Sequence, residues 1–78
     1  MPADTAGAVL DILGDVLELP AEDLRKEPDL KSHGWDSVAT LEALARLEQH
    51  FDVKFDLREF AAARTADEVV ALTEGERS

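Results

Sequence analysis

Residues 34–51, GWDSVATLEALARLEQHF, decide the fold of this 78-residue chain. Asp36 is a good N-cap residue, and the apolar residues after it recur at three- and four-residue intervals, the period of one helix face. They are Val38, Leu41, Leu44, Ala45, Leu47 and Phe51. The opposite face carries polar residues such as Glu42, Arg46, Glu48 and Gln49. The stretch therefore predicts an amphipathic helix that starts at Asp36 and turns its apolar face to a core.

A similar pattern precedes this stretch. Apolar residues between positions 6 and 17 follow the helical period, which predicts a first helix that begins near Asp4 or Thr5. Pro20 ends it. Gly14 lies inside the pattern and is expected to cost about 1 kcal/mol relative to alanine.

The connection between these two helices, residues 20–35, is long for so small a chain and contains several turn-forming residues. Residues 21–24 have room for one helical turn. We expect Leu24 and Leu30 to anchor the connection to the core. Connections of this length in small domains are often functional.

Two further helices follow the central one. Asp56 and Glu59 have the spacing of a capping box, which predicts a short third helix. Thr65 and Glu68 form a second capping box and open a last helix. Gly75 is placed to end that helix.

The fold class that follows is all-α, a bundle of four helices with a short third helix and a long loop between helices 1 and 2. We expect one domain over residues 1–78, with frayed tails at about residues 1–3 and 75–78. The chain has no cysteine, so well-patterned helices must stabilise it without disulfides.

Charge restricts the choice of partners. The chain has 8 basic and 18 acidic residues and a formal net charge of −10. This charge repels phosphate backbones and anionic membranes, so we expect neither nucleic acid nor membrane as a partner. It favours encounter with positively charged protein surfaces, although the same charge also keeps a small domain soluble. With no long apolar run and no secretory signal, a cytoplasmic protein is expected.

Ser37 directly follows the predicted N-cap and so lies in the first turn of the central helix. A helix N-terminus presents unpaired backbone N–H groups and a partial positive charge, and both favour a phosphate held there. The hydroxyl is expected to be exposed, because a loop meets the helix at this point. The alternative is that Asp36 and Ser37 only cap the helix, which is the usual role of such residues.

Residues 34–51 resemble the modification site of acyl and peptidyl carrier proteins, where an Asp-Ser pair and an aliphatic residue open an amphipathic helix with an acidic polar face. The resemblance covers nearly the whole chain, since the order of helices, the long loop and the place of the pair all match. It implies the acyl-carrier type of helical bundle. It also implies that the serine carries 4′-phosphopantetheine, which a phosphopantetheinyl transferase installs from coenzyme A.

In this resemblance Ser37 matches the modified serine, and Asp36 matches the aspartate that helps the transferase to recognise the site. The positions that contact partner proteins are Trp35, Val38, Glu42 and Glu48, with Val38 standing where leucine is usual. In carriers whose core opens to shelter an acyl chain, the matching lining residues are Leu41, Leu44 and Phe51. A core that never opens is the alternative.

Trp35 stands where carriers of fatty-acid synthesis commonly have a small residue. A Trp-Asp-Ser sequence is more similar to freestanding carriers of specialised metabolism. The indole has two interpretations, a lid over the loop and core or an exposed contact for a partner or the arm. We expect partial burial, because tryptophan is usually largely buried.

The same region contains the residue types of a Ser-His-Asp hydrolase, namely His33, Asp36 and Ser37. That chemistry needs the histidine within hydrogen-bond reach of the serine and a pocket for the substrate. The Gly-x-Ser-x-Gly motif is absent, so we expect no catalytic activity of the chain's own. Two histidines with scattered carboxylates match no metal-ligand spacing, and no metal site is predicted.

The function that this resemblance implies is that of an acyl carrier protein, which holds acyl intermediates as thioesters on the arm at Ser37. We expect a freestanding monomer serving polyketide or other specialised-metabolite biosynthesis. Its partners would be the transferase, an acyl- or aminoacyl-loading enzyme, and condensing and tailoring enzymes. An aminoacyl or peptidyl carrier of a nonribosomal peptide system is the alternative within the family. An unmodified acidic helical interaction module is the alternative outside it.

Overall fold

The computed structural model describes residues 5–77, and helices account for most of them. The helices are α1 (Thr5–Leu17), α2 (Ala21–Lys26), α3 (Ser37–Phe51), α4 (Leu57–Ala62) and α5 (Ala66–Arg77), with a 3₁₀ helix at Leu30–His33. Within the described residues, extended pairing is limited to one isolated antiparallel bridge between Asp29 and Thr65. The all-α class predicted from the sequence is confirmed.

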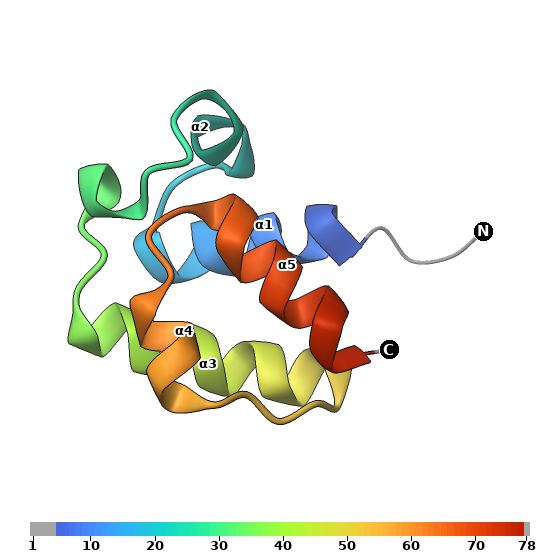
Figure 1. The fold of residues 1–78 in the computed structure, drawn as a ribbon. Coiled ribbons are helices and arrows are strands. Elements are labelled where there is room, and N and C mark those ends of the chain that lie inside the picture. The colour runs from blue at the N-terminus through green and yellow to red at the C-terminus, as the bar shows by residue number, and fades with distance from the viewer. Residues whose placement is uncertain (1–4, 78) are drawn as a thin grey trace.

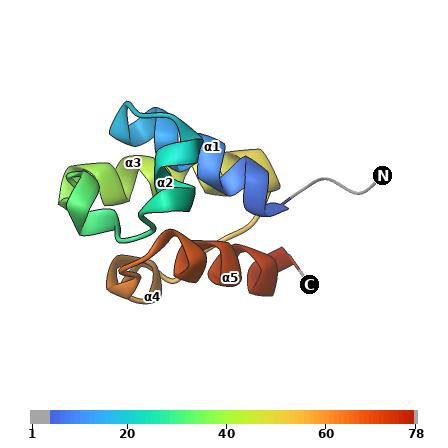
Figure 2. The same ribbon diagram turned by 90° about the horizontal axis from the view of Figure 1, so that it is seen from above.

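The helices are arranged around α1, which contacts α2, α3 and α5, while α4 contacts α3. Figure 1 shows α4 beside the first half of α3. In the view from above, α4 and α5 follow one another along one side of the molecule (Figure 2). The first turn of α3 lies at the opposite end of the molecule from the start of α1 and the end of α5 (Figures 1 and 2). That end is where the predicted modification site lies.

The core is a single cluster to which every helix contributes. Its members are Val9, Leu13, Leu24, Leu30, Ala43, Leu47, Phe60, Ala63, Ala66 and Val69. Full burial of each large aliphatic or aromatic side chain in this set contributes about 1.5–3 kcal/mol. Because the chain is short, this cluster is the main source of stability.

The connection between α1 and α3 is long, as predicted, and has more helical structure than the single turn expected. It contains α2, which is longer than the single turn expected, and the 3₁₀ helix. Leu24 and Leu30 are almost completely buried, which confirms that they anchor the connection to the core. Two backbone hydrogen bonds then attach it to the chain before α5: Leu30 N donates to Arg64 O, and Ala66 N donates to Pro28 O, both at 2.9 Å.

Gly14 is required by the way α1 ends. Glu18 adopts a left-handed conformation with φ 60°, and Leu19 N donates to Gly14 O at 2.9 Å. This is the hydrogen-bond pattern of a Schellman motif, completed by Glu18 N on Asp15 O at 3.3 Å. A Cβ atom at position 14 would lie 2.6 Å from Leu19 O, so the glycine permits the chain to fold back closely.

The buried face of α3 differs from the predicted one. Its buried residues are Ala39, Thr40, Ala43 and Leu47. Val38 is 71% exposed and Leu41 is 53% exposed, although the helical period placed both on the core face. Ala45 is also exposed. The prediction was wrong for these three because small residues let α3 approach α1 closely, which rotates the larger ones away from the core.

The last helix begins as predicted, with a capping box. Glu68 N donates to Thr65 Oγ1 at 3.2 Å, while a carboxylate oxygen of Glu68 accepts from the backbone N–H groups of Arg64 and Thr65 at 2.7 and 3.1 Å. The predicted end at Gly75 is wrong, since α5 continues to Arg77. The predicted frayed tail therefore does not begin at residue 75. The predicted tail at residues 1–3 and Ser78 lie outside the described residues.

Gly14→Ala is expected to lower the free energy of unfolding by about 1–3 kcal/mol, the usual cost of overpacking a close contact. Helix propensity alone would give a gain of about 1 kcal/mol. Urea unfolding measures the difference. Gly75→Ala is the matched control, because a Cβ atom there meets no heavy atom within 4 Å. A Gly14→Ala protein as stable as the Gly75→Ala protein would contradict the close approach of Leu19.

The capping box makes stability depend on pH. The backbone N–H groups of Arg64 and Thr65 hold the pKa of Glu68 below its ordinary value of 4.5, because they stabilise the charged carboxylate. Since the folded pKa is the lower one, this stabilisation is present above about pH 4.5 and is lost as the pH falls through the folded pKa.

Glu68→Gln is therefore expected to reduce stability at pH 7 and to have a smaller effect in acid. Urea unfolding at pH 7 and below pH 4.5 tests this expectation. Asp67→Asn is the control, because that carboxylate takes no part in the capping box. An equal loss at both pH values for Glu68→Gln would show that its charge is not what stabilises the helix.

Candidate functional site

The start of α3 is set by Asp36, as the sequence predicted. Its side chain accepts a hydrogen bond from Ala39 N at 2.8 Å, and its backbone carbonyl accepts from Thr40 N at 2.8 Å. The same carbonyl accepts from Thr40 Oγ1 at 2.7 Å, which satisfies this buried hydroxyl. Ser37 is therefore the first residue of the helix.

Ser37 is exposed, and within the described residues its hydroxyl makes no hydrogen bond. The other serine that the structure describes differs in this respect. The Ser32 hydroxyl donates to Asp29 Oδ2 at 3.2 Å and is part of the 3₁₀ turn. Ser37 thus presents a free hydroxyl where unpaired helix N–H groups favour an attached phosphate.

The turn before the site leaves Trp35 half-buried and Ser37 exposed. Gly34 ends the 3₁₀ helix in the left-handed region, φ 86°, which glycine adopts without strain. Trp35 N donates to Leu30 O at 3.2 Å, and the indole packs against the core. The chain then reaches the surface at Asp36 and Ser37.

Trp35 is half-buried and packs against the ring of Phe60 in α4, with 6.1 Å between the two ring centroids. The interpretation as a lid over the core is the one that this packing supports. Its indole Nε1 is buried and has no hydrogen-bond partner within the described residues. Leaving such a donor unpaired costs about 1–3 kcal/mol.

An open apolar groove of about 480 Å³ lies beside Ser37, between the start of α3 and α4. Its lining residues are Lys31, Trp35, Asp36, Ser37, Thr40, Leu41, Leu57 and Ala61. Leu41 and Leu57 are both about half exposed, and Val38 is more exposed still. Leu41 and Leu57 share this groove, whereas Val38 borders a separate hollow near the end of α1. Large apolar side chains exposed together in a groove indicate a surface that binds a partner or ligand.

The other predicted site residues differ in their burial and in their partners. Glu42 is exposed and forms an ion pair with Arg46 at 2.7 Å. Glu48 is half-buried, and its carboxylate accepts from Phe55 N at 2.9 Å. Leu44 and Phe51 are partly buried against the core, whereas Leu41 lines the groove. Of the three residues predicted to line an acyl chain, Leu41 is the one that lines this groove.

The residue types of a hydrolase are not assembled into a catalytic triad. His33 Nε2 lies 2.7 Å from Glu27 O and must donate its proton to that carbonyl. His33 and Asp36 border a separate hollow near the end of α1, which does not include Ser37.

Among residues 5–77, no group of three or more histidines and acidic side chains is arranged to hold a metal ion. Within that range no helix is long and apolar enough to cross a membrane.

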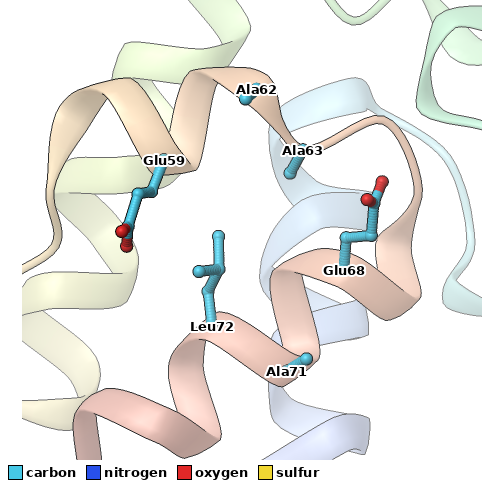
Figure 3. Close-up of a pocket in the computed structure, with 6 residues that line it drawn as sticks. All are labelled: Glu59, Ala62, Ala63, Glu68, Ala71 and Leu72. Atoms are coloured by element: carbon cyan, nitrogen blue, oxygen red, sulfur yellow. The ribbon is translucent and has the colours of Figure 1, made fainter.

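A further hollow, whose lining does not include Ser37, lies between α4 and α5 (Figure 3). Leu72 points into it from α5 and Glu59 flanks it from α4 (Figure 3). Glu68 also borders it, but its carboxylate is held by the backbone at the start of α5. With no free nucleophile or ligand set, this hollow offers no chemistry.

Comparison with known proteins identifies a family over most of the chain. The sequence model of a family described as the phosphopantetheine attachment site matches residues 7–73. No curated protein and no solved structure matches the chain. The matched range includes the α3 N-terminus, the groove and the helices that form both.

Asp36→Ala is expected to lower the free energy of unfolding by about 1 kcal/mol, because it removes the N-cap of α3. Asp36→Ser should retain most of this stability, since a serine hydroxyl also caps. Ser37→Ala should change it by less than about 0.5 kcal/mol, as expected for an exposed position. Chemical denaturation of the three variants makes the comparison. Equal stability of the alanine and serine variants at position 36 would show that the cap contributes nothing.

Proposed function

The chain belongs to the phosphopantetheine attachment-site family, and we propose that Ser37 is the residue on which it carries the 4′-phosphopantetheine arm. Members of this family are carrier proteins, and the arm is their prosthetic group. The observation that carries the proposal is the hydroxyl of Ser37, exposed and without a hydrogen bond at the first position of α3. The hydroxyl of Ser32, by contrast, is bound to Asp29.

The residues around Ser37 fit such a group. The α3 N-terminus favours the negative charge of the phosphodiester. Lys31 is the one cationic residue among those that line the adjacent groove, and it can pair with the same charge. When attached, the arm supplies a thiol that holds the cargo as a thioester. The chain itself supplies the tether, which raises the local concentration of cargo at each partner enzyme.

Asp36 has two roles in this proposal. It caps α3 and so holds Ser37 at the helix start, as the hydrogen bond to Ala39 N shows. Asp36 is itself exposed beside Ser37, and we infer that the transferase recognises it there. Asp36→Ser keeps a capping side chain without the charge, whereas Asp36→Ala removes both. Comparison of the two variants therefore separates these two roles.

Carriers of this family interact with phosphopantetheinyl transferases and with catalytic enzymes. We propose that these partners dock on the exposed apolar residues beside Ser37, chiefly Val38 and Leu41, with Trp35 at the edge. Glu42 adds an exposed carboxylate on the same helix, and the net charge of −10 favours basic partner surfaces. Glu48 contributes less than the sequence suggested, because its carboxylate is held by Phe55 N.

For the cargo we propose an acyl group rather than an aminoacyl group. The groove beside Ser37 is lined mainly by apolar side chains, of which Trp35, Leu41 and Leu57 are the largest. The resemblance of Trp-Asp-Ser to carriers of specialised metabolism favours polyketide or related biosynthesis. An aminoacyl carrier of a peptide synthetase is the second candidate, and loading assays with acyl and aminoacyl donors distinguish the two.

The proposed function is tested by intact mass before and after incubation with coenzyme A and a broad-specificity phosphopantetheinyl transferase. The wild type and Ser32→Ala are expected to gain one phosphopantetheine, and Ser37→Ala none. Circular dichroism shows that each variant is folded. If the folded, unmodified wild type gains no mass, or if Ser37→Ala gains the group, the proposal for Ser37 is wrong. A wild type that cannot be modified would leave the acidic interaction module as the better account.

A further inference from the structure

Two hollows next to the attachment site differ in charge. The hollow near the end of α1 is lined by the carboxylates of Glu18, Asp36 and Glu42 and by no lysine or arginine. A larger hollow of about 720 Å³, on the side of α4, is lined by Lys31 and Arg64. Two cations at one hollow stand out in a chain with a net charge of −10.

The two cationic side chains of the larger hollow are free for a partner. Lys31 and Arg64 are exposed, and neither forms an ion pair within the described residues. Two neighbouring carboxylates are held by the backbone instead: Asp29 accepts from Lys31 N at 3.1 Å, and Glu68 accepts from Arg64 N at 2.7 Å. These carboxylates start the 3₁₀ helix and α5, so the cationic side chains stay without an ion pair.

Backbone hydrogen bonds hold the two cations at the same hollow. Leu30, directly before Lys31, donates its N–H to Arg64 O at 2.9 Å. Asp29 and Thr65 form the isolated antiparallel bridge beside this bond. The 3₁₀ helix and the segment between α4 and α5 therefore cannot separate without breaking these contacts. Cations on such a fixed backbone lose less entropy on binding than cations on two independent loops.

The larger hollow adjoins the groove that contains Ser37, because Lys31, Trp35 and Ala61 line both. A stable interface covers about 800 Å² on each partner. A patch of that area extends over one face of this molecule, whose described part measures 30 × 29 × 17 Å. A transferase docked at Ser37 therefore reaches the larger hollow as well.

We propose that the hollow lined by Lys31 and Arg64 receives an acidic side chain of the phosphopantetheinyl transferase, and that this contact fixes the orientation in which the transferase docks at Ser37. This inference rests on the proposed function. A carboxylate complements the hollow, because a guanidinium binds it with two parallel hydrogen bonds. The acidic hollow near the end of α1 repels the same side chain, so a transferase turned the other way round is disfavoured.

Arg64→Glu is the direct test, because Arg64 lines the larger hollow and not the groove with Ser37. Initial rates of modification by a broad-specificity transferase, followed by intact mass at a series of apo-protein concentrations, give KM and kcat separately. The KM for the apo protein is expected to rise about fivefold or more, because repulsion replaces attraction. The kcat and the KM for coenzyme A should stay as in the wild type. High salt should reduce the rise in KM, since it screens exposed charges.

Arg58→Glu is the matched control, because it reverses an exposed cation of α4 that does not line the hollow and changes the net charge by the same amount. Its KM for the apo protein is expected to stay close to that of the wild type. Circular dichroism shows whether each variant is folded. Arg64→Gln is the milder variant, in case Arg64→Glu does not fold, and should raise KM in the same direction by a smaller factor.

The possible results separate this inference from the proposed function. Equal KM values for Arg64→Glu and Arg58→Glu would overturn the inference, because net charge alone would then act. A rise in the KM for coenzyme A in place of that for the apo protein would also overturn it, since the hollow would then bind the phosphates of coenzyme A. If the wild type is modified and Arg64→Glu behaves like it, the function stands and the docking contact is wrong. If the wild type gains no arm, the proposed function is wrong and the inference falls with it.

Discussion

The hydrogen bond from the Ala39 backbone to the Asp36 carboxylate determines where α3 begins, and the rest of the site depends on that position. Each residue along a helix is rotated by about 100° from the previous one. With the start at Ser37, the serine faces solvent while Ala39 and Ala43 face the core. The cap therefore places Ser37, the proposed attachment residue, in the first turn as well as stabilising the helix.

The small buried residues of α3 also affect which side chains are exposed. Alanines at positions 39 and 43 let the helix lie close to its neighbours, so the larger Val38 and Leu41 are left outside. A chain of this length has few large apolar residues, and leaving them exposed forgoes some of the stability that burial would give. Exposure of apolar side chains around one free hydroxyl is better explained by partners and the arm than by folding.

The sequence was sufficient to predict the helical class, the Asp36 cap and the capping box at Thr65 and Glu68, because each depends on neighbours within one helical turn. It failed for features that depend on distant contacts. The apolar period of residues 38–51 does not show which of two adjacent faces of the helix packs against α1. Leu41 was therefore assigned to the core. Gly14 looked like a weak point of α1, because the close approach of Leu19 is visible only once the helix end is folded.

The groove beside Ser37 is built from two segments far apart in the sequence, and the connection before α3 joins them. Leu30 N and Ala66 N form backbone hydrogen bonds that tie this connection to the chain between α4 and α5. Trp35, at the end of this connection, adds a contact with Phe60 of α4. The connection is therefore attached to both sides of the groove. The long connection is therefore a structural support of the site. Its buried leucines keep Trp35 in place against Phe60 of α4.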